Sequence, residues 1–268
     1  MKQRLISAFF GIILFIIVIF SPVEVVDVCV LLLIEMALHE LLTALKLNEY
    51  KITYLLSMLF PIVTVLTRHF TSISQMNVVY IYILVMLAIT VFKYPRYKFT
   101  HIASSLIAAV FITTSLLLIP SILRMDNGII NLFLVFIGGW ITDTCAYFSG
   151  KAFGKHKLAP QLSPNKTIEG SVGGVVGVMI VFAVYALLIS NINNMVDTNI
   201  LNAVILGLIC GGVSQIGDLC ASAIKRDQNI KDFGKLMPGH GGVMDRFDSV
   251  LYTAPAVYFF ITNFPVFF

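Results

Sequence analysis

The sequence predicts an all-α, polytopic integral membrane protein with about nine transmembrane helices. Hydrophobic residues make up 58% of the 268 residues, and the mean hydropathy is +0.93. Several apolar runs approach or exceed the length of about 20 residues that a helix needs to cross a bilayer. The length alone would suit one or two soluble domains, but this composition excludes a soluble fold.

Nine apolar runs are the candidate spans, and we expect the whole chain, 1–268, to form one membrane-embedded domain. The first run has no small-residue cleavage site after it and is followed by further apolar runs, so it is interpreted as a retained span rather than a signal peptide. The second run is the least clean, because Asp27, Glu35, His39 and Glu40 interrupt it. The spans are expected at 5–21, 25–45, 52–67, 77–92, 99–119, 129–148, 171–190, 200–221 and 249–267.

The distribution of basic residues predicts the orientation. Of the 18 Lys and Arg residues, 16 fall in one alternating set of the segments between spans, and only Arg68 and Arg124 fall in the other. Cytoplasmic segments carry this excess of positive charge. We therefore expect a cytoplasmic N-terminus, two rich cytoplasmic segments at about 149–170 and 222–248, and an external C-terminus in the inner or plasma membrane of the cell. The net charge of +4 is modest and does not indicate a nucleic-acid partner.

The small residues of the apolar runs indicate packing rather than chemistry. Three pairs fit the small-xxx-small spacing that lets helix backbones approach closely in lipid: Gly170 with Gly174, Gly173 with Gly177, and Gly207 with Gly211. Packing within one subunit is the favoured use, and a homodimer face is the alternative. The four cysteines form no CxxC pair and have no His-spaced partner, so neither a zinc site nor a disulfide framework is predicted.

The segment Ser222–Asp248 holds the densest charge in the chain. Nine of its 27 residues are charged, five as cations and four as carboxylates, in a chain that is 12% charged. Lys and Arg supply charge and donors to phosphate oxygens, and Asp supplies the hard oxygen ligands that Mg²⁺ prefers. Gly239, Gly241 and Gly242 permit a backbone to approach a phosphate closely. A polyanion bound with a metal ion is therefore favoured over an ordinary basic loop.

Helical spacing brings polar residues of this region to common faces. If the span before the segment stays helical, Ser214, Asp218, Ser222 and Lys225 lie on one stripe. Asp245 and Asp248 would share a face in the same way. Two readings stay open at this point: carboxylates aimed at one cytoplasmic pocket, or a structural ion pair of Asp218 with Lys225 or Arg226. Asp143, late in its span, is either a functional carboxylate or an interfacial one.

The order of residues in the segment resembles a known signature. Ser222-x-Ile-Lys-Arg, Lys231-Asp-x-Gly, Met237-Pro-Gly-His-Gly-Gly and Asp245-Arg-x-Asp together resemble the signature of the phosphatidate cytidylyltransferases, also called CDP-diacylglycerol synthases. The segment Trp140–Gly170 is also similar to that family in its Gly-Lys-His-Lys run and its Ser-Pro-x-Lys-Thr turn. The match covers roughly residues 138–253, whereas residues 1–120 resemble the family only in spanning the membrane.

The resemblance implies a nucleotidyltransferase that makes CDP-diacylglycerol and pyrophosphate from CTP and phosphatidate, in membrane lipid. It implies Mg²⁺ as the cofactor, with a second cation as a further option. Asp218 and Asp245 are the implied metal ligands, with Asp143 and Asp248 as additional candidates, and Lys225 and Arg226 would hold phosphates. The implied substrate-binding residues are Lys166, Ser222, Lys231, Gly239, His240, Gly241, Gly242 and Arg246.

Other functions remain as alternatives. One is a CTP-dependent transferase that acts on a different lipid phosphate or a polyprenol. Another is an ion-coupled transporter, which many spans and intramembrane carboxylates also suit. Against the transporter, the polar residues gather on one side of the membrane and mark no route across it. For His156 and His240, a structural hydrogen bond is favoured over catalysis.

Overall fold

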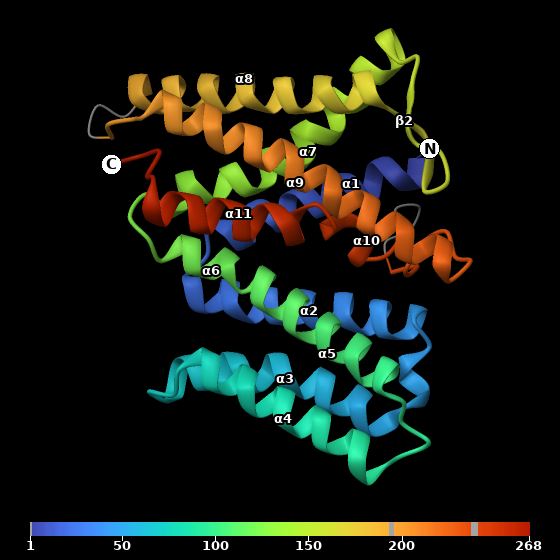
Figure 1. The fold of residues 1–268 in the computed structure, drawn as a ribbon. Helices are drawn as coiled ribbons and strands as arrows, with labels where there is room; N and C mark the ends of the chain where they lie inside the picture. The colour runs from blue at the N-terminus through green and yellow to red at the C-terminus, as the bar shows by residue number, and fades with distance from the viewer. Residues whose placement is uncertain (1, 193–195, 237–240) are drawn as a thin grey trace. The chain divides into compact units, whose positions relative to one another are not determined.

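The computed structural model describes residues 2–192, 196–236 and 241–268 (Figure 1). Helices lie at all nine positions where apolar runs predict spans, so the helical membrane fold is confirmed. Six stretches are long and apolar enough to cross a membrane by length and composition. The count of nine spans stays a prediction, because α11 (Val250–Asn263) has only 14 residues and α1 (Lys2–Ile19) and α2 (Val23–Ala44) are not among the six.

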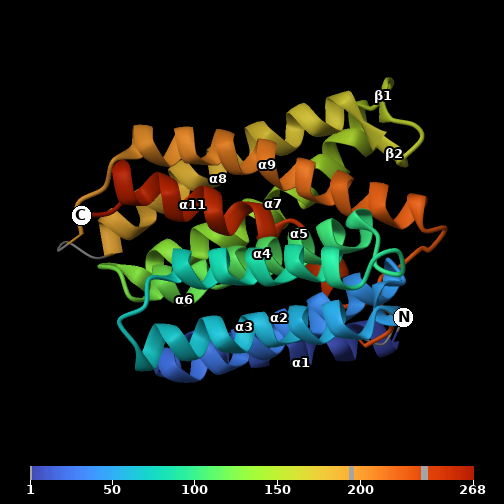
Figure 2. The ribbon, with the colours of Figure 1, turned by 60° about the horizontal axis from the view of Figure 1, so that its bottom comes forward.

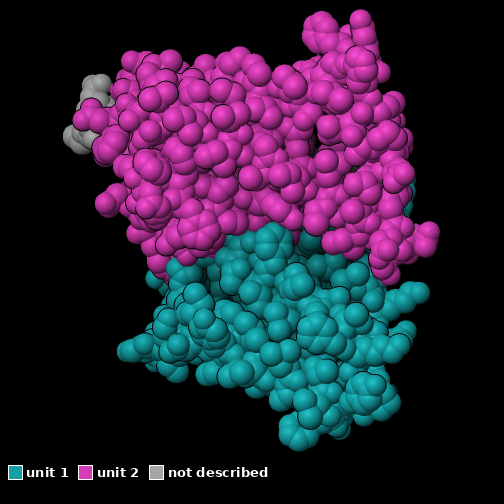
Figure 3. Space-filling model, in the orientation of Figure 1, with its two compact units in different colours: residues 1–117, 230–246 teal, residues 118–229, 247–268 magenta. Residues whose placement is uncertain are grey.

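The chain divides into two compact units, coloured separately in Figure 3. The first comprises residues 1–117 and 230–246. It contains α1, α2, the short 3-10 helix Leu47–Glu49, α3 (Lys51–Phe70), α4 (Gln75–Phe92) and α5 (Phe99–Leu116). Its core is apolar, with Ile34, Met86 and Ile112 fully buried. Two polar pairs also lie in it: the buried Ser57 and Tyr82 hydroxyls lie 2.9 Å apart, and the buried Asp27 carboxylate lies 3.0 Å from the more exposed His69 ring.

The second unit comprises residues 118–229 and 247–268. Its helices are α6 (Leu118–Leu123), α7 (Gly128–Phe153), α8 (Ile168–Ile192), α9 (Ile200–Asp227) and α11, and α10 (Met244–Phe247) joins the two units in sequence. Within this unit α7, α8, α9 and α11 run side by side (Figure 2). The Thr253 hydroxyl of α11 donates to the carbonyl of Val135 in α7, at 3.0 Å.

Glycines set the close approach of α8 to its two neighbours. A Cβ added to Gly174 would lie 2.9 Å from the carbonyl oxygen of Thr142 in α7. One added to Gly207 would lie 2.8 Å from the Cα of Met179, and one on Gly211 would lie 3.0 Å from the Cα of Val175. Such distances leave no room for a side chain. The small-xxx-small spacing is therefore used for packing within the subunit, as favoured from the sequence.

Two features depart from the all-helical expectation. The polar segment between α7 and α8 contains an antiparallel hairpin of β1 (Lys157–Ala159) and β2 (Ser163–Thr167). At the C-terminus, α11 ends at Asn263, because Pro265 disfavours a helical backbone at the preceding Phe264. The last residues run extended beside 197–199, where the amide of Phe268 donates to the carbonyl of Asp197.

Candidate functional site

The β1–β2 hairpin presents Lys166 at the entrance to α8. In the hairpin Lys157 pairs with Thr167 and Ala159 with Ser163. The strand that carries Lys166 ends at Thr167, and α8 begins at the next residue. The Thr167 hydroxyl accepts a hydrogen bond from the amide of Gly170, at 3.1 Å. A Thr side chain that satisfies an otherwise unpaired amide of the first turn caps a helix. This cap explains why α8 begins at Ile168, and it holds Lys166 at a defined place.

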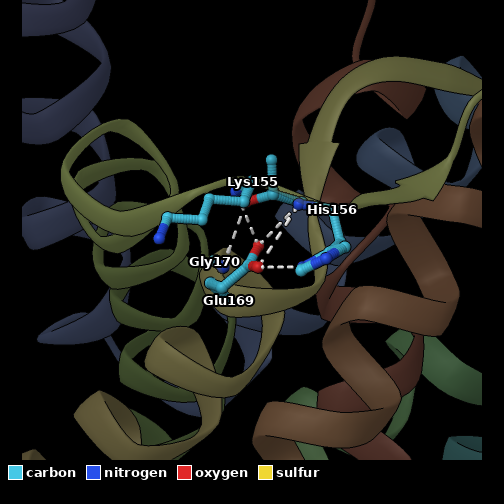
Figure 4. Close-up of polar contacts among 5 residues, drawn as sticks. Lys155, His156, Glu169 and Gly170 are labelled. Carbon is cyan, nitrogen blue, oxygen red and sulfur yellow. Dashed lines mark hydrogen bonds and ion pairs between the residues drawn. The ribbon is translucent and has the colours of Figure 1, made fainter.

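Glu169, in the first turn of α8, binds the link between α7 and β1 (Figure 4). Its carboxylate accepts hydrogen bonds from the amides of Lys155 (3.1 Å) and His156 (3.2 Å) and pairs with the His156 ring at 2.6 Å. The prediction of a structural role for His156 is therefore confirmed. The side chain of Lys155 extends away from this cluster (Figure 4) and is exposed. No role was expected for Glu169, although it lies two residues after the capping Thr167.

A cavity of about 460 Å³ opens where this hairpin meets three helices of the second unit. Each element contributes polar groups to its wall: Asp143 and Lys151 from α7, Asn165 and Lys166 from the hairpin, Ser171 from α8, and Gln215 and Asp218 from α9. Small residues, Ala146, Gly150 and Gly170, line the rest together with Tyr147, Leu158 and Thr167.

Three carboxylates and one ammonium group form the polar centre of this unit. The Lys166 ammonium binds the Asp218 carboxylate directly. Ser249, in the turn before α11, donates its hydroxyl to Asp143 at 3.4 Å and its amide to Asp248 at 2.7 Å. A Cβ on Gly217 would lie 2.8 Å from the carbonyl oxygen of Asp248, so this glycine lets the turn approach the helix beside Asp218.

The protonation of Lys166 reflects these surroundings. Burial lowers the pKa of its ammonium group below the ordinary value, because the charged form loses hydration. Asp143 and Asp248 raise that pKa by stabilising the charge, and Lys225 lowers it by repulsion. The cation is thus placed within reach of two further carboxylates and of a second lysine. With a divalent cation on its carboxylates, such an arrangement could bind a polyanion.

Several of the predicted residues lie on one uninterrupted helix, α9. It stays helical to Asp227, six residues beyond the predicted span, so the stripe of Ser214, Asp218, Ser222 and Lys225 is confirmed. The Arg226 side chain donates from Nε to the carbonyl of Leu162 in the hairpin turn, at 3.3 Å. Asp218 forms an ion pair, as the structural reading expected, and the partner seen in the structure is Lys166.

Gln215, which the sequence analysis did not select, ties α9 to α8. Its amide nitrogen donates to the carbonyls of Gly211 (3.0 Å) and Ser171 (3.1 Å), and the residue is 8% exposed. It lies one turn before Asp218 and lines the same cavity. A buried Gln in an apolar helix was the available signal, because an amide there needs partners.

Asp245 belongs to the first unit, and its carboxylate organises the segment 230–246. Its Oδ2 accepts hydrogen bonds from the amides of Phe233 (2.8 Å) and Gly242 (3.0 Å). Gly241 has φ +83°, a left-handed conformation that favours glycine. Lys231 and Arg246 are exposed, whereas Gly239 and His240 lie outside the described residues. Asp245 and Asp248 do not share a regular helix face, because Asp248 lies in the turn between α10 and α11.

The carboxylates of this unit fit one of the ways in which proteins hold Mg²⁺. Among the described residues, no three His, Cys, Asp or Glu side chains are grouped so as to hold a metal ion by themselves. Mg²⁺ commonly takes only one or two carboxylates and completes its shell with substrate phosphates and water. The carboxylates that line or adjoin the cavity, Asp143, Asp218 and Asp248, fit that mode of binding, which depends on a phosphate substrate.

Comparison with known proteins agrees with this chemistry. The phosphatidate cytidylyltransferase of Bacillus subtilis (strain 168) is 30% identical over 270 residues, 98% of each chain. That of Staphylococcus aureus (strain COL) is 32% identical over 260 residues, 95% of this chain and 96% of the relative. That of Staphylococcus epidermidis (strain ATCC 12228 / FDA PCI 1200) is 30% identical over 258 residues, with the same two coverages. The family model described as "Cytidylyltransferase family" matches residues 2–264. The chain therefore belongs to the cytidylyltransferase family.

Proposed function

We propose that the protein transfers the cytidylyl group of CTP to phosphatidate, giving CDP-diacylglycerol and pyrophosphate in phospholipid biosynthesis. The observation that carries the proposal is the contact of Lys166 with Asp218 at the wall of the 460 Å³ cavity, beside Asp143 and Asp248. Full-length relatives named phosphatidate cytidylyltransferase support the choice of substrates.

The reaction needs charge compensation more than it needs a base. A phosphate oxygen of phosphatidate attacks the α-phosphorus of CTP, and the bond from that phosphorus to the bridging oxygen breaks. Pyrophosphate leaves with the bonding pair. Because the phosphatidate oxygen is already anionic near neutral pH, no strong general base has to remove a proton. The difficulty is to bring two polyanions together and to stabilise charge on the leaving group.

The residues of the second unit suit this task. Lys166 lines the cavity and holds a positive charge among carboxylates, and Lys225 lies close enough to lower its pKa. Both would bind phosphate oxygens of CTP. Arg226 fixes the hairpin turn through Leu162 and keeps its remaining guanidinium donors for the same anion.

Mg²⁺ is proposed as the cofactor, with Asp218 of the second unit as its principal ligand and Asp143 and Asp248 of the same unit as additional ones. Asp245 stays a candidate ligand on the strength of the sequence signature. When bound, Mg²⁺ would neutralise phosphate charge and polarise the phosphorus–oxygen bond that breaks. Ser222, Lys231, Gly241, Gly242 and Arg246 are proposed to contact the nucleotide or the lipid headgroup. A second cation and a homodimer are compatible with the proposal.

The proposed orientation places the N-terminus, the hairpin and the segment 222–248 in the cytoplasm, with the C-terminus outside. It rests on the concentration of 16 of 18 basic residues in one set of loops. CTP is a cytoplasmic metabolite, so the site has to open to that side. The cavity must also open sideways to the bilayer, so that the acyl chains stay in lipid.

A pyrophosphate-release assay in detergent micelles tests the proposal. Purified protein with Mg²⁺, CTP and phosphatidate should release pyrophosphate and form a labelled CDP-lipid, and omission of either substrate should abolish both products. No sealed membrane is needed, because no gradient is used. Absence of product from every phosphatidate tested, together with solute uptake into closed vesicles, would instead establish a transporter.

A further inference from the structure

Glu40, on α2, is a buried carboxylate that the proposed reaction does not yet use. It lies one turn from the end of the helix, is 8% exposed, and belongs to the same compact unit as the segment 230–246. A buried charge is costly unless hydrogen bonds compensate it. Its two oxygens have separate partners: Oε1 accepts from the amide of Val243 at 3.1 Å, and Oε2 accepts from the amide of Met244 at 2.9 Å.

The described residues of the segment 230–246 leave space for this carboxylate. A Cβ added to Gly234 or to Gly242 would meet the Glu40 carboxylate closer than real Cβ atoms approach any atom. The two glycines therefore flank it from different positions of the segment. Both glycines belong to the charged segment 222–248. Their lack of a side chain makes room for the Glu40 carboxylate, in addition to any room that it makes for a phosphate.

Glu40 and Asp245 together bind three consecutive amides. Gly242 donates to Asp245, at 3.0 Å, while Val243 and Met244 donate to Glu40. The next residue in the chain is Asp245 itself, whose carboxylate also holds the amide of Phe233. Displacing the amides of 243 and 244 would therefore move the backbone from which the Asp245 side chain projects.

From these contacts we infer that Glu40 is a positioning residue for the reaction, which acts by fixing residues 241–246 and hence Asp245 and Arg246. The inference rests on the proposed function for its catalytic consequence, whereas the fixing of the segment is a separate physical property. Glu40 itself touches no reacting atom. It acts through the two hydrogen bonds that it accepts from backbone amides. The neutral side chain of Gln has the same shape but cannot accept both.

The test compares Glu40→Gln with Glu35→Gln in the full-length protein in micelles. Gln has one acceptor oxygen, and its NH₂ group would face an amide donor. Glu35 lies on the same helix and one of its oxygens has no partner, so the same Glu→Gln change there leaves the contacts of the segment intact. We expect amide exchange of peptides covering 241–247 to accelerate roughly tenfold or more in Glu40→Gln alone. The kcat should fall roughly ten- to hundredfold while the KM for CTP changes less.

A second pair of variants covers the case in which Glu40→Gln does not fold. Gly234→Ala keeps the carboxylate and pushes it from one side, so it should reproduce both effects. Gly212→Ala, in α9, has nothing within 4 Å of the added Cβ and should match the wild type. Unchanged exchange at 241–247, or a kcat within twofold of wild type despite faster exchange, overturns the inference. Inactive wild-type protein would reject the proposed function, and the exchange data would still decide whether Glu40 fixes the segment.

Discussion

Replacing Lys166 with Met removes an ammonium group that contacts Asp218. Met keeps most of the length and apolar volume of the stem, so the change is mainly one of charge. The Lys166 and Asp218 side chains are 29% and 27% exposed, which places the contact in a partly desolvated site. A charge-assisted hydrogen bond to a phosphate oxygen there is worth about 1.5–3 kcal/mol. We therefore expect kcat/KM for CTP to fall roughly ten- to hundredfold.

The same substitution should change the Mg²⁺ dependence in the opposite sense. Lys166 neutralises Asp218 in the structure, so a cation that binds this carboxylate has to compete with the ammonium group. Without that competitor, half-maximal activity should require less Mg²⁺ although the maximum is lower. Titration of pyrophosphate release against Mg²⁺ at saturating phosphatidate measures both quantities.

Lys155→Met is the matched control for this experiment. Lys155 belongs to the same polar segment, but its side chain is exposed and points away from Glu169 (Figure 4). Its substitution should leave kcat/KM within about twofold, because an exposed charge contributes little. The reasoning is refuted if Lys166→Met retains near-normal activity at every Mg²⁺ concentration, or if Lys155→Met loses as much.

Three further predictions concern the metal, the packing and the topology. Asp218→Asn should abolish Mg²⁺-dependent turnover while thermal unfolding in detergent shows a folded protein; activity at low Mg²⁺ would exclude Asp218 as a ligand. Gly174→Leu should destabilise the protein by about 1–3 kcal/mol or more, because the side chain meets Thr142, and the melting temperature should fall. Gly212→Leu, with open space around it, is the control and should not lower it. Lys235→Cys on a Cys-free background should react with impermeant reagents only from the cytoplasmic side; labelling only from outside would reverse the topology.

Much of the fold was predictable because bilayer physics constrains it strongly. Apolar length locates helices, and small residues at four-residue spacing mark where two backbones approach, as Gly207 and Gly211 do against α8. The face shared by Asp218 and Lys225 followed from the helical repeat alone. The lengths of α9 and α11 were harder to predict from the sequence. In α9 the hydropathy falls before the helix ends, and α11 ends early because a proline follows it.

The partners of the polar groups were not predictable in the same way. Asp218 pairs with Lys166, 52 residues away in sequence, and Glu40 binds amides more than 200 residues away. No local period connects such positions. Ser249 was also missed, because a Ser beside an Asp is common, and only the turn before α11 shows that it links Asp143 to Asp248.

The glycine contact between α9 and α8 also determines the rotational register of the carboxylate that follows. Gly211 is held against Val175, and Asp218 comes seven residues later on the same uninterrupted helix. Seven residues are close to two full turns, so Asp218 points in nearly the same direction as the locked glycine. One residue inserted between them would turn the carboxylate by about 100° and shift it by about 1.5 Å along the axis. A change of length within 211–218 should therefore displace the Asp218 carboxylate even when every side chain of the stretch is kept.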